Sequence, residues 1–261
     1  MTTENAIGAS AITDAITQAA SRGQPALVAF MTAGFPSKAS FLEDLAKLAT
    51  AADVVEIGVP FTDPLADGLT IQRSSHKALA NGVTLNWILE TLKLAPRRPT
   101  APLLLMSYLN PLLAFGLDVL PAAMRAAGVS GVIVPDLPLE ESADLKTALN
   151  GQGLALVQLV SPVTPDDRLA RVVQASQGFV YAVTLTGTTG KQVANPANLV
   201  GYLRKVRQLA KVPVCAGFGI RDASQVRALA GMVEGVIVGS ALVDVLEKAA
   251  DPVAFLTALR Q

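Results

Sequence analysis

Short apolar runs alternate with longer amphipathic segments along the whole chain. The runs are four to seven residues long and rich in Val, Leu and Ile, which is typical of buried strands. The pattern predicts eight strands, over Ala26–Thr32, Asp53–Val59, Leu103–Ser107, Gly131–Val134, Leu154–Leu159, Phe179–Thr184, Val212–Ala216 and Gly235–Val238.

A helical pattern follows each of these runs, which indicates parallel strands joined by crossover helices. Two more helices are expected outside the repeating units, one at Ala11–Arg22 before the first strand and one at Pro252–Leu259 near the end. The helices within the units are expected at Lys38–Thr50, Leu69–Ala80 with Leu85–Leu94, Leu117–Ala127, Glu140–Asn150, Asp166–Gln174, Pro196–Ala210, Ala223–Leu229 and Ala241–Lys248.

Eight strand–helix units favour an α/β fold of the (β/α)8 or TIM barrel type, with an extra N-terminal helix. The length of 261 residues suits such a barrel, for which about 250 residues are typical. The alternative is a doubly wound open sheet, but no Gly-x-Gly-x-x-Gly follows the first strand. The chain has no linker, charge block or low-complexity segment, so we expect one domain over residues 1–261.

The composition excludes several classes of function. Twenty-one basic and 21 acidic residues leave no net field for nucleic acid or an anionic membrane, and few aromatics are present for base stacking. One Cys and one His allow neither a disulfide nor a zinc site, so Cys215 is expected to be a buried thiol and no metal is expected. No apolar stretch reaches the roughly 18 residues of a membrane span, and no signal peptide is evident. We therefore expect a cytoplasmic protein.

Carboxylates gather around the end of the second predicted strand. Glu56 interrupts an apolar run, where burial of a charge is costly unless the group is paired or functional. Asp63 and Asp67 follow in the next loop, at the strand end where barrel enzymes place their chemistry. The alternative is structural: the two Asp side chains cap turns, and Glu56 pairs with a Lys.

Glycines gather at the ends of the last three strands. Gly219 follows the seventh strand, and Gly239 and Ser240 follow the eighth, where barrels often bind phosphate through backbone N–H groups. Ser240 also suits a simple helix N-cap. The Gly- and Thr-rich loop that contains Thr189 and Gly190 has the composition of a closing lid, although a passive surface loop is the alternative. Together with two carboxylates, these features predict acid–base chemistry on a phosphorylated apolar substrate.

Residues 56–68 read Glu-Ile-Gly-Val-Pro-Phe-Thr-Asp-Pro-Leu-Ala-Asp-Gly, and this stretch resembles the signature of the tryptophan synthase α subunit family. The segments Leu103–Asn110, Gly131–Ser142 and Gly187–Gly190 are also similar to family motifs. Family members mostly carry Asp where this chain has Phe35. The resemblance covers most of the chain.

The resemblance implies retro-aldol cleavage of indole-3-glycerol phosphate to indole and glyceraldehyde 3-phosphate. By motif position, Asp67 would stabilise the ring nitrogen and Glu56 would shuttle protons. Tyr181 falls on the family's strand-six tyrosine and Thr189 on its lid threonine. The substrate-binding residues would be Phe30 as a wall of the central cavity, with core packing as the alternative, Leu105 on the indole pocket, and Phe218. Gly190, Gly219, Gly239 and Ser240 would hold the phosphate.

The resemblance also implies a partner. No cofactor is expected in this chain, because pyridoxal phosphate would belong to a β subunit within an α2β2 complex. Phe61 and Leu65 in the loop 60–65, with Asp63 and segment 107–112, would dock on that subunit. Three alternatives remain: a stand-alone lyase that releases free indole, a related phosphate-binding barrel isomerase, and a weak catalyst that mainly activates the β subunit.

Overall fold

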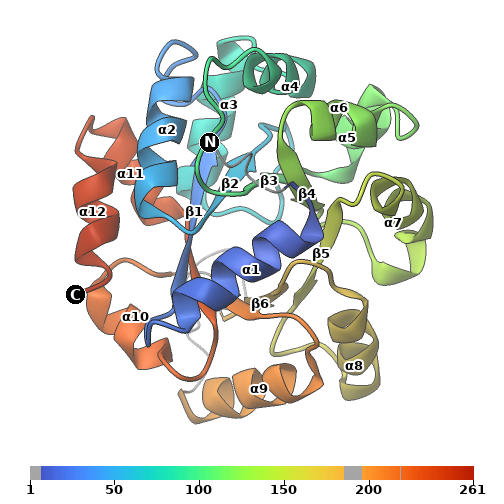
Figure 1. Cartoon of the computed structure of the whole chain (residues 1–261), viewed down its shortest axis with the longest axis vertical. Helices are drawn as coiled ribbons and strands as arrows, with labels where there is room; N and C mark the ends of the chain where they lie inside the picture. Colours follow the sequence, from blue (N-terminus) through green and yellow to red (C-terminus); the bar gives the residue numbers. More distant parts are fainter. Residues whose placement is uncertain (1–6, 185–195, 218) are drawn as a thin grey trace, which may run out of the picture.

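The computed structural model describes residues 7–184, 196–217 and 219–261. Eight parallel strands pair in sequence order, and β8 pairs back onto β1, so the sheet closes into a barrel (Figure 1). The strands are β1 (Ala26–Thr32), β2 (Val54–Gly58), β3 (Leu103–Met106), β4 (Val129–Ile133), β5 (Ala155–Val160), β6 (Val180–Val183), β7 (Val214–Gly217) and β8 (Gly235–Val238).

Helices surround the barrel, as the amphipathic segments predicted. The first, α1 (Ala9–Ala20), precedes β1 and lies across the barrel rather than beside it (Figure 1). The outer elements are α2 (Phe41–Ala51), α3 (Leu69–Ala80), α4 (Leu85–Lys93), α5 (Leu109–Phe115), α6 (Leu120–Ala126), the 3₁₀ turn η1 (Leu139–Glu141), α7 (Ala143–Asn150), α8 (Asp166–Ala175), α9 (Pro196–Leu209), α10 (Ala223–Leu229), α11 (Ser240–Glu247) and α12 (Pro252–Ala258).

The predicted TIM barrel with an extra N-terminal helix is confirmed, and β1 and β8 have the bounds expected from the sequence. The other strands begin and end within two residues of their predicted bounds. Helix α5 is not among the predicted helices, and it contains Asn110 and Pro111, residues that are more typical of turns. Pro111 lies in the first turn of α5, where its missing N–H group has no helical acceptor in any case.

Helix α1 closes the N-terminal end of the barrel. Ile12 and Ile16 are fully buried against residues near the starts of several strands, including Ala26, Ala155 and Phe179. The Thr13 hydroxyl donates to the Gly178 carbonyl at 2.8 Å and anchors the helix. Because the strands are parallel, the loops that follow them lie at the opposite, C-terminal end of the barrel.

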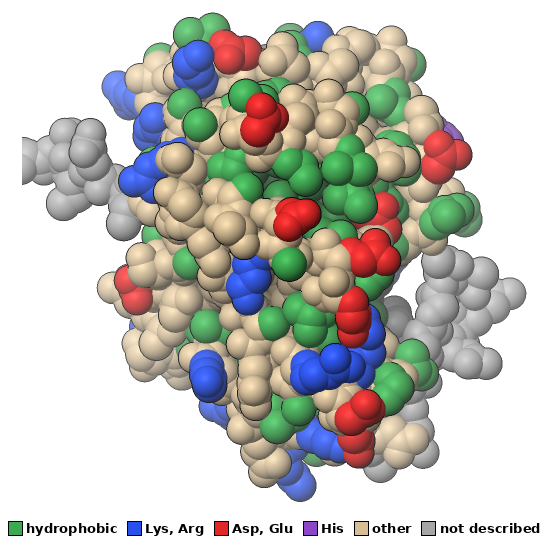
Figure 2. Space-filling model, turned by 90° about the vertical axis from the view of Figure 1, so that its right-hand side faces the viewer, with side chains coloured by type: hydrophobic (Ala, Val, Ile, Leu, Met, Phe, Trp, Pro, Cys, Tyr) green, Lys and Arg blue, Asp and Glu red, His purple; other side chains and the backbone are tan. Residues whose placement is uncertain are grey.

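Apolar side chains are exposed on the side formed by α5, α6 and α7. Leu113 on α5 and Val119 just before α6 are each about half exposed. In Figure 2, which views this side, hydrophobic side chains gather across the middle of the surface with acidic groups among them. None of the described helices is long and apolar enough to cross a membrane.

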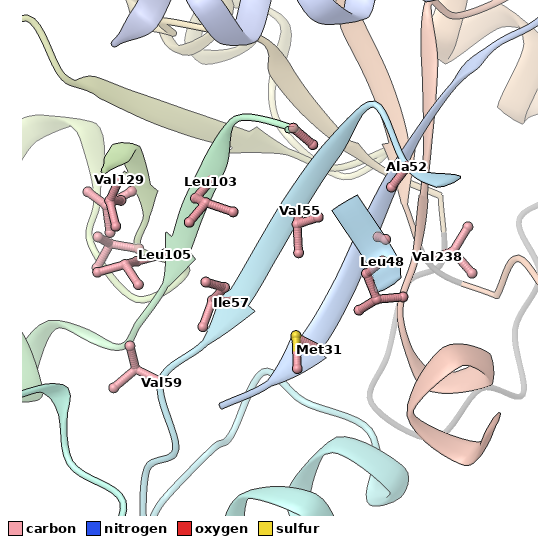
Figure 3. Packing of buried hydrophobic residues seen from close by; sticks show 14 of the residues in the cluster. Met31, Leu48, Ala52, Val55, Ile57, Val59, Leu103, Leu105, Val129 and Val238 are labelled. Atoms are coloured by element: carbon pink, nitrogen blue, oxygen red, sulfur yellow. The ribbon is translucent and has the colours of Figure 1, made fainter. Parts of the chain in front are cut away.

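The strands are apolar on both faces because side chains fill the barrel on one face and contact helices on the other. Val55, Ile57 and Leu103 belong to the layer between strands and helices (Figure 3). Val54 and Leu104 belong to the cluster inside the barrel. Since neighbours along a strand point to opposite faces, Glu56 points inward from between Val55 and Ile57.

Candidate active site

Glu56 lies at the centre of β2, in register with Phe30 on β1 and Leu104 on β3. Only 1% of its surface is exposed, and its Oε2 atom has no hydrogen-bond partner in the described parts of the chain. Burial, aided by the negative charge of Asp67, raises the pKa of Glu56 to about 8. The carboxyl group is therefore protonated at neutral pH and can act as an acid.

Asp67 lies in the loop between β2 and α3. Its Oδ2 atom accepts a hydrogen bond from the Tyr108 hydroxyl at 3.1 Å. Burial raises the pKa of Asp67 to about 6, while the bond from Tyr108 acts in the opposite direction. Between about pH 6 and 8 the site thus contains one ionised and one protonated carboxyl group, an arrangement that assigns base and acid roles to different residues.

Tyr181 points into the barrel from β6 and is 5% exposed. Burial raises its pKa well above the usual value, and the charges of Glu56 and Asp67 add to this shift. Its hydroxyl therefore stays neutral. The ring lies against Gly217 on β7, where a Cβ atom would be 2.5 Å from the nearest ring carbon. Glycine at that position leaves room for the tyrosine beside the carboxylates.

An apolar pocket opens beside Asp67. Phe30 forms one wall, and its ring occupies the space where a Cβ atom on Gly58 would stand, 2.5 Å from the nearest ring carbon. The wall on β3 is Met106, not Leu105, which was expected there. Leu105 instead packs between strands and helices with Ile57 (Figure 3). Side chains alternate along a strand, so Leu105 and Met106 cannot face the same side.

The predicted phosphate residues lie at the ends of adjacent strands. Gly239 is the N-cap of α11 and Ser240 is its first residue. Gly219 follows β7 and has a φ of +87°, a conformation that favours glycine. Its carbonyl accepts from the Gln225 side chain at 3.0 Å, and Gln225 also forms a capping box with Asp222 at the start of α10. The arrangement places two helix N-termini beside the end of the barrel.

Some predicted features lie outside the described residues. These are Thr189, Gly190 and Phe218. Within the described ranges, His, Cys, Asp and Glu side chains form no group of three or more that could hold a metal ion. Cys215 is a buried thiol, as expected.

The loop at the barrel mouth is partly exposed and partly folded inward. Leu65 and Leu69 are 82% and 80% exposed. Phe61, expected near solvent, instead stacks on Tyr108 with the ring centroids 5.1 Å apart. Asp136 accepts a hydrogen bond from the Leu109 N–H group at 2.9 Å, so it supports the start of α5 rather than reaching the pocket.

Besides Met106, the contact of Tyr108 and the supporting position of Phe35 were missed from the sequence. Tyr108 was expected only as part of the docking segment 107–112, but it is 6% exposed and contacts Asp67 directly. Phe35 is 1% exposed, packs with Phe30 and Val243, and has the Lys77 ammonium group 5.3 Å from its ring centroid. Phe35 therefore supports the Phe30 wall from behind.

The chain is similar to known proteins over nearly its full length. A family model described as tryptophan synthase alpha chain matches residues 16–258. The tryptophan synthase alpha chain of Chloroflexus aggregans is 45% identical over 241 residues, which cover 92% of this chain and 90% of that protein. The alpha chain of Nitratidesulfovibrio vulgaris is 40% identical over 253 residues, covering 97% and 98% of the two chains.

Solved structures are similar over nearly the full length. A tryptophan synthase structure from Mycobacterium tuberculosis in its aminoacrylate-bound form gives a TM-score of 0.85 at 30% identity, covering 95% of this chain and 97% of that one. A structure of the tryptophan synthase α2β2 complex from Pyrococcus furiosus gives 0.82 at 34% identity, covering 91% and 98%. With its fold, its paired carboxylates and these full-length relatives, the chain belongs to the tryptophan synthase alpha chain family.

Proposed function

We propose that this chain is the α subunit of a tryptophan synthase and cleaves indole-3-glycerol phosphate to indole and glyceraldehyde 3-phosphate. The observation that carries the proposal is a pair of carboxyl groups, Glu56 buried inside the barrel and Asp67 on the wall of an apolar pocket. Their raised pKa values, about 8 and about 6, favour a protonated Glu56 and an ionised Asp67 at neutral pH. Such a pair supplies an acid and a base at the same pH.

Glu56 is the proton shuttle in this proposal. Its carboxyl group gives a proton to the indole carbon that bears the side chain, which turns the ring into an electron sink. When the carbon–carbon bond breaks, its electron pair returns to the ring and restores the aromatic system. The hydroxyl on the departing carbon then loses its proton to the Glu56 carboxylate and becomes the aldehyde carbonyl. Glu56 ends the cycle protonated again.

Asp67 stabilises the charge that develops in the ring. Its carboxylate accepts a hydrogen bond from the indole N–H group as that nitrogen becomes positive. Tyr181 contributes a neutral hydroxyl on the opposite side of the barrel interior. The indole ring of the substrate packs against Phe30 and Met106, which line the pocket.

The phosphate binds at the ends of β7 and β8 in this proposal. Backbone N–H groups near Gly219 and at the start of α11, beside Gly239 and Ser240, lie at the positive ends of helix dipoles. By motif position, Gly190 would add to the phosphate site and Thr189 would act in the lid; both lie outside the described residues.

The mouth of the barrel is the proposed docking surface for a β subunit. Leu65 and Leu69 expose apolar surface there. The relative from P. furiosus forms an α2β2 complex. Indole is small and apolar, so it passes to the β subunit instead of being lost to solvent.

The test is indole release from indole-3-glycerol phosphate by the isolated chain and by the chain with a tryptophan synthase β subunit. We expect slow cleavage alone and strong activation by the partner. A fast isolated chain that ignores the β subunit would identify a stand-alone lyase. No cleavage under either condition would overturn the proposal.

A further inference from the structure

Tyr108 stands where β3 passes into α5, and it is 6% exposed. Its phenolic oxygen accepts a hydrogen bond from the Ala66 backbone N–H group at 2.9 Å. The same hydroxyl lies 3.1 Å from Asp67 Oδ2. The Ala66 amide can only donate, so the single phenolic proton is free to go to the carboxylate. The direction of the bond to Asp67 is thereby fixed.

One stacking contact on the ring and two hydrogen bonds of the neighbouring backbone hold the tyrosine in place. Phe61 stacks on its ring at 5.1 Å with 26° between the planes. The Val59 N–H group donates to the Met106 carbonyl at 2.8 Å, which joins the two strand ends. Asp136 binds the N–H group of the next residue, Leu109. A phenol held from these sides keeps its hydroxyl at one place relative to the loop that carries Asp67.

We infer that Tyr108 is a positioning residue for Asp67: it fixes the carboxylate at the edge of the pocket and favours its ionised form. A hydrogen bond donated to a carboxylate stabilises the charged state, whereas burial favours the neutral state. Tyr108 thus offsets part of the effect of burial. The consequence for catalysis, though not the assignment itself, rests on the proposed function.

The other groups that face Asp67 do not supply this effect. Glu56 on β2 places a second acidic group near Asp67. Tyr181 on β6 interacts electrostatically with both carboxylates. Across the described residues, the ion pairs between basic and acidic side chains do not include Asp67. Among the described residues, the Tyr108 hydroxyl is therefore the group whose hydrogen bond favours the ionised form of Asp67.

The direct test is a titration without substrate. Aspartate side-chain carboxyl groups are labelled with ¹³C and followed by NMR from pH 4 to 9, and Asp67→Asn identifies the Asp67 signal. In Tyr108→Phe we expect the Asp67 midpoint to rise above its wild-type value by roughly one pH unit, a tenfold change in its ionisation equilibrium. The matched control is Tyr202→Phe, which deletes a phenolic hydroxyl bound to the Val160 carbonyl at 2.8 Å, away from the site. If the titration midpoint of Asp67 shifts no more in Tyr108→Phe than in Tyr202→Phe, the inference is overturned.

The second test is the pH profile of kcat/KM for indole-3-glycerol phosphate. Activity needs ionised Asp67 and is lost as the pH falls through its pKa, so a higher pKa moves the acid limb to higher pH. Tyr108→Phe should lose roughly tenfold in kcat/KM below pH 6 and much less above pH 7. A pH-independent loss would indicate a merely structural role and contradict the inference. If the wild-type chain cleaves nothing, the proposed function fails, while the NMR titration still decides the role of Tyr108.

Discussion

The two ends of the barrel are built from the same eight strands but have opposite characters. At the N-terminal end, α1 places Ile12 and Ile16 against apolar strand residues. Inside the barrel and towards its C-terminal end, Glu56, Tyr181 and Asp67 bring three titratable groups together with raised pKa values. One end therefore stabilises the fold, and the other carries groups whose charged forms the fold disfavours. Variants at the two ends should separate activity from stability.

The largest effect is expected from the carboxyl groups at the C-terminal end. Glu56→Gln and Asp67→Asn should each lower indole release by roughly a thousandfold, because general acid–base groups contribute about 10²–10⁴. Circular dichroism and thermal unfolding should show an intact fold. Wild-type turnover in either variant would remove that residue from the mechanism.

The next effect is the pH dependence of stability that Glu56 imposes. Its pKa is about 8 in the folded protein and near 4.5 when unfolded, so the folded state binds the extra proton between these values. The free energy of unfolding should therefore fall as pH rises from about 4.5 to 8, by a few kcal/mol in all. Glu56→Gln should remove most of this decline.

Denaturant unfolding at pH 5 and pH 8 measures the decline in each protein. The control is Gln18→Ala on the exposed face of α1, which leaves every buried carboxyl group in place and should keep the wild-type pH dependence. An equal decline in Glu56→Gln and wild type would show that Glu56 is ionised throughout.

At the N-terminal end of the barrel, which α1 closes, a substitution should lower stability and leave activity nearly unchanged. Ile16→Ala removes a fully buried side chain from α1 and should cost about 3 kcal/mol of stability, within the 2–5 kcal/mol usual for such changes. At a temperature where the variant is folded, kcat/KM should stay near the wild-type value. A large loss of activity without a loss of stability would mean that the two ends are not separate.

The smallest effect is expected at the rim. Asp63 is exposed, so Asp63→Ala should alter the isolated chain's cleavage little and weaken activation by a β subunit by less than about tenfold, as for a charge at an interface rim. Titration of activity with increasing β subunit measures this. Unchanged activation would place Asp63 outside the interface.

The sequence predicted the barrel and its two carboxyl groups because both leave local signals. Strands covered on two faces are continuous apolar runs, and Glu56 is conspicuous because it interrupts one. In the third strand, a continuous apolar run left the inward-facing positions undetermined. In Leu103–Met106 every residue is apolar, so nothing in the run tells which side chains face inward, and Leu105 was assigned to the wrong layer.

The contact between Tyr108 and Asp67 could not be predicted in the same way. The two residues are 41 positions apart, and they meet because the ends of β2 and β3 are adjacent. Helix α5, which is not among the predicted helices, contains Asn110 and Pro111, which are more typical of turns but also fit a first helical turn. Local pattern identifies the groups with chemistry, whereas the groups that orient them depend on register and packing.

Helix α1 also determines where substrate can enter the barrel and where product can leave it. With the N-terminal end closed, substrate arrives and product departs at the same end where Leu65 and Leu69 are exposed. A partner bound over that end would set the residence time of the product without touching a catalytic side chain. The order of events then becomes important: substrate must enter before the partner covers the mouth, or pass between the two proteins.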